Sequence, residues 1–480
     1  MMNQLFYGDN LEVLQKHIGE ESVDLCYVDP PFNSQRNYNQ IYNNVGKDDI
    51  AQSQAFVDTW EWGHSAELQL DLLCKEPKYT RRLVDTVLGF EKILGKGDML
   101  AYLVSMAVRF AEIWRVLKPT GSFYVHCDPT ASHYLKLLLD SIFCDRGGDF
   151  RNEIIWGYQW GGVGKRNFAR KHDVIFWYSK HKTKWTFNEK IMREPYITKD
   201  TRWHNHDEGK LLRDIWDDIP IINTMSKERL GYATQKPVVL LERIIKACSH
   251  ENDTVLDAFC GCGTTVTAAQ ALKRQWIGID ITYNAISLIL KRLKDTFGND
   301  IEKQIHLTGI PKYIESAMAL AHKKDDRLRK EFEKWAILTY SDNYAKINDK
   351  KGSDKGIDGI AYILSGTAVF SVKSGNVSVK DVRDLRGVVE RESAAAGILL
   401  TLEEPTKPML QEAAASGYVD DIPSVTMPKK TPKLQIVTIQ ELLDGARMNL
   451  PLPEAVVKSA QKHKNKDGNQ QMDFEDGEIN

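Results

Sequence analysis

The segment that most constrains the fold of this chain runs from residue 254 to residue 265, where a short apolar stretch leads through a glycine-rich loop into the start of a helix. Gly261 and Gly263 lie in this loop, shortly after an acidic residue ends the apolar stretch. A second apolar stretch at 276–279 follows one helix later and ends at Asp280. Strand, helix and strand in this order predict a parallel βαβ unit.

The N-terminal region repeats the same alternation. Its apolar stretches predict strands at 4–7, 23–28, 122–126, 154–156 and 174–178. Helical periodicity predicts helices at 11–17, about 65–117, 131–142 and 237–250, and Pro119 and Gly121 are expected to stop the long one. We therefore expect a Rossmann-like α/β core, with a parallel sheet covered by helices on both faces.

Two further motifs lie at predicted strand ends. Residues 29–32 read Asp-Pro-Pro-Phe directly after the apolar stretch at 23–28. Such a tetrapeptide also forms an ordinary rigid turn, and alone it leaves that alternative open. Asp9 follows the first predicted strand, and the run Thr-Gln-Lys-Pro at 234–237 precedes the helix at 237–250.

Together these motifs resemble the beta group of DNA amino-methyltransferases, in which the catalytic motif comes first, the recognition segment next and the cofactor motif last. The resemblance covers residues 3 to about 300, including the segments 151–156 and 172–178. It implies transfer of a methyl group from S-adenosylmethionine to the exocyclic amine of a flipped base in double-stranded DNA. The chain contains no Pro-Cys dipeptide, which methylation of a cytosine ring carbon would require.

The resemblance assigns the catalytic role to Asp29, Pro30, Pro31 and Phe32. An exocyclic amine is a poor nucleophile because its lone pair is delocalised into the ring. The Asp29 carboxylate and the Pro30 carbonyl would accept the two amine hydrogens and localise that pair. Phe32 would stack on the flipped base and offset the stacking lost from the duplex.

The resemblance also implies a set of cofactor-binding residues: Asp9, Gln235, Lys236, Asp257, Phe259, Gly261, Gly263, Thr264 and Asp280. The glycines would allow close approach of the backbone to the cofactor. Asp280, 23 residues after Asp257, would hold the ribose hydroxyls, and a helix N-cap is its alternative role. Asp9 would contact the adenine, while Gln235 and Lys236 have the alternative of being exposed cap residues.

The acceptor is expected to be DNA, with adenine N6 favoured over cytosine N4. The chain as a whole has 64 Lys+Arg and 66 Asp+Glu, but residues 164–213 hold 13 Lys+Arg against 6 Asp+Glu. A basic stretch with interleaved aromatic residues suits phosphate neutralisation and base contacts, so residues 181–232 are predicted to form a target-recognition insertion. The alternatives are a methyltransferase acting on RNA or on a protein glutamine, and a non-catalytic DNA-binding protein.

The C-terminal third resembles an Mrr-type restriction endonuclease domain of the PD-(D/E)XK group. Asp358 precedes one predicted strand and Lys373 lies on the next, and this pair would form the nuclease-like site, with Mg²⁺ as its cofactor. Glu331 or Glu333 would contribute from the preceding helix. The position two before the lysine is Ser371, where the family has Glu or Gln, so we expect a domain that binds DNA and has lost cleavage.

These assignments divide the chain into a methyltransferase domain at 1–300, a linker at 301–329, a restriction-endonuclease-like PD-(D/E)XK α/β domain at 330–445 and a polar, disordered tail at 446–480. No apolar run approaches the roughly 20 residues of a membrane helix, which predicts a cytoplasmic protein. The resemblance implies that the protein is prokaryotic. Seven cysteines fit reduced thiols, and Cys260 and Cys262 lack a second ligand pair for zinc, so no metal is expected in the methyltransferase. A homodimer and a companion restriction subunit both stay open as partners.

Overall fold

The computed structural model describes residues 2–31, 36–42, 51–58, 60, 62–159, 166, 168–196, 208–223, 226, 228–230, 234–322, 326–342, 344–348, 356–419 and 431–450. Phe32 lies outside these residues, and so do parts of the predicted recognition insertion, including 197–207. The predicted tail also lies outside them from residue 451 onward.

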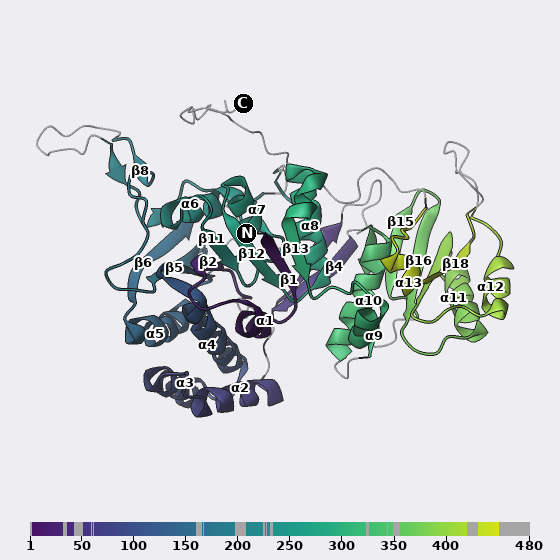
Figure 1. Cartoon of the computed structure of the whole chain (residues 1–480), viewed down its shortest axis with the longest axis horizontal. Helices are drawn as coiled ribbons and strands as arrows, with labels where there is room; N and C mark the ends of the chain where they lie inside the picture. The colour runs from purple at the N-terminus through teal and green to yellow at the C-terminus, as the bar shows by residue number, and fades with distance from the viewer. Residues whose placement is uncertain are drawn as a thin grey trace, which may run out of the picture.

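A nine-stranded sheet forms the centre of the larger part of the molecule, with the strand order β10-β6-β7-β5-β2-β11-β12-β1-β13 among the described residues (Figure 1). The strands are β1 (Asn3–Tyr7), β2 (Val23–Val28), β5 (Leu117–Cys127), β6 (Asp149–Gly157), β7 (His172–Ser179), β10 (Ile215–Trp216), β11 (Thr254–Asp257), β12 (Gln275–Asp280) and β13 (Ile305–Thr308). The predicted α/β core is confirmed by this arrangement. The strands nearest the centre are neighbours although their positions in the sequence are far apart.

The prediction of an all-parallel sheet is wrong for one strand. β7 runs antiparallel to both of its neighbours, β5 and β6. The described residues between β6 and β7 contain no helix, and a parallel pair needs a crossover that is usually helical. Short apolar runs carry no information about direction, which is why the sequence pattern did not reveal this strand.

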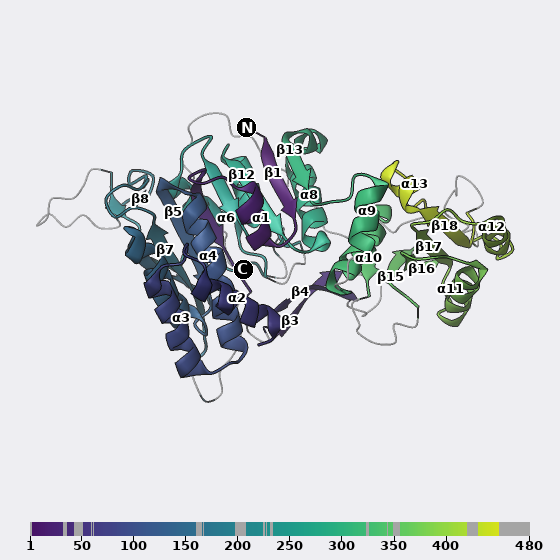
Figure 2. The same ribbon diagram turned by 60° about the horizontal axis from the view of Figure 1, so that its bottom comes forward.

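Helices cover both faces of the sheet, as predicted (Figures 1 and 2). One face packs on α6 (Val238–Cys248), α7 (Thr264–Ala271) and α8 (Tyr283–Phe297). The other packs on α1 (Asn10–His17), α3 (Arg81–Leu94), α4 (Asp98–Val116) and α5 (Ser132–Phe143). Side chains alternate between the faces, so Leu5 joins the first cluster and Phe6 the second.

The long helix expected at 65–117 is divided into α2 (His64–Lys75), α3 and α4. Pro119 and Gly121 do not end it, since α4 ends at Val116 and both residues lie within β5. They instead occupy a register irregularity: Val23 on β2 pairs with Leu117, but Leu25 pairs with Ser122. The irregularity accommodates a proline, which cannot donate a hydrogen bond to the sheet.

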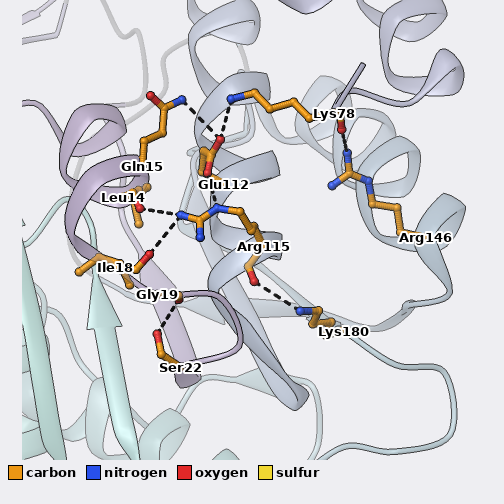
Figure 3. A network of polar contacts seen from close by, with 10 residues as sticks. All are labelled: Leu14, Gln15, Ile18, Gly19, Ser22, Lys78, Glu112, Arg115, Arg146 and Lys180. Atoms are coloured by element: carbon orange, nitrogen blue, oxygen red, sulfur yellow. Dashed lines mark hydrogen bonds and ion pairs between the residues drawn. The ribbon is translucent and has the colours of Figure 1, made fainter. Parts of the chain in front are cut away.

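A buried carboxylate fixes α1 and α4 to each other (Figure 3). Glu112 on α4 accepts hydrogen bonds from Lys78 at 2.9 Å and from Arg115 at 2.7 Å. Arg115 also donates to the Leu14 carbonyl near the end of α1, at 2.6 Å. Burial acts to raise the pKa of Glu112, but its bonds to Arg115 and Lys78 outweigh that effect and lower it. This ionised network holds the helices that follow β1 and precede β5.

Residues 301–329, expected as a linker, contain regular structure. The 3₁₀ segment η2 (Asn299–Gln304) leads into β13, which pairs with β1 as the last strand of the sheet. Then come α9 (Ile314–Ala321) and the start of α10 (Asp326–Tyr340). A strand of four residues between polar segments gives too weak a periodicity to be recognised.

The C-terminal region has its own five-stranded sheet in the order β14-β15-β16-β17-β18. Its strands are β14 (Ala345–Ile347), β15 (Gly359–Ile363), β16 (Gly366–Lys373), β17 (Ala396–Thr401) and β18 (Leu434–Thr438), accompanied by α11 (Val379–Arg391), α12 (Lys407–Ala414) and α13 (Ile439–Leu443). Two hairpins form separate two-stranded sheets: β3 (Arg36–Tyr42) with β4 (Ala51–Asp58), and β8 (Arg193–Glu194) with β9 (Lys210–Leu211). Within the described residues, no helix is both long enough and apolar enough to cross a membrane.

Candidate active site

Four of the predicted site acids lie at one edge of the large sheet. β2, β11, β12 and β1 are parallel neighbours, so their carboxyl ends face the same side. Asp29 follows β2, Asp257 ends β11, Asp280 ends β12 and Asp9 lies two residues beyond β1. This is the edge of an α/β sheet at which ligands bind.

Asp29 is held by a cation from a distant part of the chain. Lys236 Nζ lies 2.5 Å from Asp29 Oδ2, and the two side chains are only 11% and 17% exposed. The other oxygen, Oδ1, is buried and has no hydrogen-bond partner among the described residues. Pro30 is buried next to it, and Pro31 is partly buried. An unsatisfied buried carboxylate oxygen is costly, and it suits a donor that a bound substrate would bring.

The glycine loop is closely packed against the sheet. Gly261 and Gly263 have φ values of +48° and +76°, in the left-handed region. A Cβ at Gly263 would lie 2.8 Å from Ile289 Cγ1 on α8, so a larger residue does not fit. The Gly261 N–H donates to Asp280 Oδ2 at 2.9 Å, which ties the loop to the end of β12.

Asp257 and Asp280 are buried acids whose pKa values are raised. Burial raises the pKa of Asp257 to about 7, and it accepts a hydrogen bond from the Phe259 N–H at 3.0 Å. Burial likewise raises the pKa of Asp280 to about 6. Asp280 Oδ1 accepts from the Thr282 N–H at 2.9 Å, but it is Thr282 that caps α8. Asp280 therefore positions the cap residue Thr282. Asp257 and Asp280 both lie beside the glycine loop, and no cation among the described residues forms an ion pair with either.

Asp9 has a structural role in this conformation. It is the N-cap of α1, and its Oδ1 accepts the Leu11 N–H at 2.9 Å. Its Oδ2 lies 2.9 Å from Arg109, a buried residue of α4 that also bonds Asn10. Both carboxylate oxygens thus have partners, and the cofactor contact of Asp9 stays a prediction.

Gln235 forms two hydrogen bonds with earlier residues of the segment that precedes α6. Its amide donates to the Glu228 carbonyl and accepts from the Leu230 N–H, both at 2.8 Å. Glu228 in turn accepts the Val238 N–H at the start of α6, at 2.8 Å. Neither Gln235 nor Lys236 is a freely exposed cap residue, because Gln235 shapes the loop that presents Lys236 to Asp29.

Arg292, which the sequence analysis did not identify, joins this loop to the glycine loop. Its guanidinium donates to Thr264 Oγ1 at 3.0 Å and to the Cys262 carbonyl at 3.2 Å. Arg292 Nη2 also lies 3.6 Å from Glu228 Oε1. A single arginine on a helix gives no sequence signal, since its partners are distant in the chain.

A buried polar chain, also missed, lies behind Asp29. Tyr27 on β2 bonds His126 Nδ1 at 2.8 Å, and His126 Nε2 bonds Asp173 on β7 at 3.0 Å. Burial acts to raise the pKa of Asp173, but the contact with His126 outweighs it and lowers the value. The histidine is fully buried on β5. This chain of hydrogen bonds connects three neighbouring strands of the large sheet, β2, β5 and β7.

In the C-terminal sheet, Asp358 and Lys373 lie at the same end of the β15–β16 hairpin. Asp358 Oδ2 accepts the Val372 N–H at 2.8 Å. Ser371 is buried at the position expected for a further acid. Glu331 does not face this site, whereas Glu333 bonds Lys330, which lies 3.9 Å from Asp358. Over the described part of the chain, no three His, Cys, Asp or Glu residues gather in a way that could hold a metal ion.

Comparison with known families decides what this edge belongs to. The model of the N6_N4_Mtase family, described as DNA methylase, matches residues 23–291. The chain is a member of this DNA methylase family. The match contains Asp29, the basic segment and the glycine loop, and this methylase is therefore an enzyme of the DNA amino-methyltransferase class. A second model, of the NACHT-associated inactive Restriction Endonuclease 1 family, matches residues 328–444.

Curated relatives of this methylase are similar over the same region. Type II methyltransferase M.HpaI of Haemophilus parainfluenzae is 29% identical over 62% of the chain and 76% of that protein. DNA adenine methyltransferase YhdJ of Escherichia coli is 28% identical, over 60% and 82%. Type II methyltransferase M.HinfI of Haemophilus influenzae is 30% identical, over 63% and 71%. The solved PvuII DNA methyltransferase (cytosine-N4-specific) is 18% identical over 63% of the chain and 90% of that structure, with a TM-score of 0.41.

Proposed function

We propose that the protein transfers a methyl group from S-adenosylmethionine to the exocyclic amine of a flipped base in double-stranded DNA, with adenine N6 as the preferred acceptor. The observation that carries the proposal is the asymmetry of the Asp29 carboxylate. Lys236 holds Oδ2, while Oδ1 is buried without a described partner. A fixed acceptor oxygen at a ligand-binding edge is what an amine donor requires.

The chain's own residues would prepare the amine for attack. Asp29 Oδ1 would accept one amine hydrogen and the Pro30 carbonyl the other, which localises the nitrogen lone pair. Lys236 would keep the carboxylate oriented while positive charge develops on the nitrogen. Pro31 stiffens the backbone at this point, and Phe32, outside the described residues, is expected to stack on the base.

The residues at the strand ends fit the proposed cofactor. The glycine loop admits close backbone approach at Gly261 and Gly263, and Asp280 lies beside it with a carboxylate suited to ribose hydroxyls. Asp257 and Phe259 border the same loop, and Thr264 begins the helix that follows it. Bound S-adenosylmethionine would supply an electrophilic methyl group on a positively charged sulfur.

The choice of adenine rests on similarity. One of the similar curated proteins is named as a DNA adenine methyltransferase. Cytosine N4 is the alternative within the same chemistry, and RNA or a protein glutamine is the alternative outside DNA. The basic segment at 164–213 supports a nucleic acid, because phosphate neutralisation needs such a surface. The activity would serve restriction and modification or epigenetic marking in a prokaryotic cytoplasm, with a homodimer or a companion nuclease subunit still open.

We further propose that the C-terminal domain binds DNA without cleaving it. Ser371 replaces one expected metal ligand, and Asp358 Oδ2 already accepts a backbone hydrogen bond. A magnesium site needs several oxygen ligands, which a single carboxylate does not provide. The match to a family described as inactive points the same way.

The test uses the purified full chain, mixed-sequence duplex DNA and methyl-labelled S-adenosylmethionine, followed by digestion and mass spectrometry of the nucleosides. We expect N6-methyladenine; N4-methylcytosine would keep the mechanism and change the base. Asp29→Ala should abolish labelling while cofactor binding persists. Labelling of no nucleoside by a protein that binds the cofactor, or full activity of Asp29→Ala, would refute the proposal.

A further inference from the structure

The C-terminal domain contacts the predicted cofactor edge of the methylase through α10. Glu331 lies on α10, inside the region that matches the inactive endonuclease family. The sequence predicts either Glu331 or Glu333 for the nuclease-like site. Its Oε2 instead accepts the Tyr283 N–H at 3.1 Å and the Tyr7 hydroxyl at 3.3 Å. α10 stands beside α8, between the two sheets (Figure 1).

The two tyrosines that Glu331 joins lie directly against the predicted cofactor residues. Tyr7 is the last residue of β1 and pairs in register with Asp280 on β12. The Gly8 N–H donates to the Asp280 carbonyl at 3.0 Å, so the ends of these strands are also bonded to each other. Tyr283 is the first residue of α8, just after the turn that Asp280 stabilises. Glu331 therefore connects the chain on both sides of Asp280.

This contact is buried and has more than one point of attachment. Glu331 is 9% exposed, and Tyr7 and Tyr283 are 8% and 7% exposed. The tyrosine rings meet edge to face with centroids 6.1 Å apart. The Tyr283 hydroxyl bonds Thr339, on α10, at 2.9 Å. A charged acceptor at the first N–H of a helix is a favourable cap, and it is stronger when buried.

We propose that Glu331 is a positioning residue of the cofactor site, by which the docked C-terminal domain sets the affinity of the methylase for S-adenosylmethionine. Glu331 contacts neither the cofactor nor the base in this role; it holds the end of β1 and the start of α8, which fix Asp280 and the glycine loop between them. The endonuclease-like domain would then serve the methylase as a structural support. The inference rests on the proposed cofactor and extends it.

The test compares full-length wild type, Glu331→Gln and Glu331→Ala by calorimetric titration with S-adenosylmethionine and by steady-state methylation. Glu331→Ala loses both hydrogen bonds and also the ion pair of Glu331 with Lys334, 3.0 Å away on the same helix, and should weaken binding about tenfold. Glu331→Gln keeps an acceptor oxygen and should recover part of that loss. KM for S-adenosylmethionine should rise while kcat and KM for DNA stay within about twofold. Glu315→Gln, which removes an exposed charge from the neighbouring α9, is the matched control.

A purely structural role would lower the thermal midpoint of the Glu331 variants and leave their cofactor affinity unchanged. Equal affinity of wild type and both variants, or an equal loss in Glu315→Gln, would overturn the inference. Glu331→Gln keeps the test decisive if Glu331→Ala fails to fold. If the wild type does not bind S-adenosylmethionine, the proposed function fails, and this inference fails with it. If the wild type binds and the Glu331 variants bind equally well, only this inference fails.

Discussion

Replacing Gly263 by alanine tests whether the cofactor loop depends on close packing as well as on backbone conformation. Gly263 has φ +76° and ψ +31°, and a left-handed conformation costs alanine about 1 kcal/mol relative to glycine. The added Cβ would also lie 2.8 Å from Ile289 Cγ1 and 3.2 Å from Val266 Cγ2. Ile289 is fully buried, so it has to leave its rotamer or push α8 away, at about 1–3 kcal/mol. The expected total is about 2–4 kcal/mol of lost unfolding free energy.

Gly147→Ala supplies the matched control. Gly147 is also left-handed, with φ +85° and ψ +8°, but a Cβ there would meet no atom within 4 Å. This variant should lose only the conformational part, about 1 kcal/mol. Urea unfolding followed by tryptophan fluorescence measures both variants, and titration with S-adenosylmethionine should show weakened binding for Gly263→Ala alone. Equal destabilisation of the two variants would show that Ile289 yields without cost, and the packing argument would be wrong.

Three further predictions concern the Lys236–Asp29 ion pair, the buried acid Asp257 and the nuclease-like site. Lys236→Met should lower the unfolding free energy by about 2–4 kcal/mol and abolish nearly all activity, because it leaves the Asp29 carboxylate buried without its cation. If the double variant with Asp29→Asn does not recover stability in urea unfolding, loss of this ion pair is not the cause. Burial raises the pKa of Asp257 from 3.8 to about 7, so this group stabilises the fold fully below pH 3.8 and loses that contribution as pH rises to about 7. Asp257→Asn should therefore gain stability relative to wild type as the pH rises from 3.8 to about 7, and a difference that does not change with pH would contradict this. Supercoiled plasmid with Mg²⁺ should stay uncut by the full chain; nicking that Lys373→Ala abolishes would show an active nuclease.

The positions of the site acids were predictable because parallel strands end at one edge. Asp29 and Asp280 each follow a recognisable apolar run, so the sheet places them together once the strands are parallel. The direction of β7 and the existence of β13 were not predictable from periodicity. A strand of four residues between polar segments does not differ from a loop in pattern alone.

The supporting contacts of the site could not be predicted, because they join residues far apart in the chain. The sequence predicts that Glu331 or Glu333 contributes to a nuclease-like site, because both lie on the helix before Asp358. Glu331 instead bonds Tyr7 and Tyr283 and pairs with Lys334. Arg292 likewise binds Thr264 from another helix. No local pattern marks such residues, since their roles are set by tertiary packing.

The position of β1 has a consequence for synthesis of the protein. The two strands that pair with β1, β12 and β13, are both made after residue 274. A growing chain therefore carries Asn3–Tyr7 through most of the translation of the methylase region with neither edge of that strand covered. Unpaired strand edges are prone to aggregate with other chains. An N-terminal segment can fold as it leaves the ribosome only when its contacts are with residues nearby in the sequence. Ribosome-bound chains ending before residue 275 should need chaperones that shield β1. The sheet edge that holds the four site acids can assemble only once the last strands have left the ribosome.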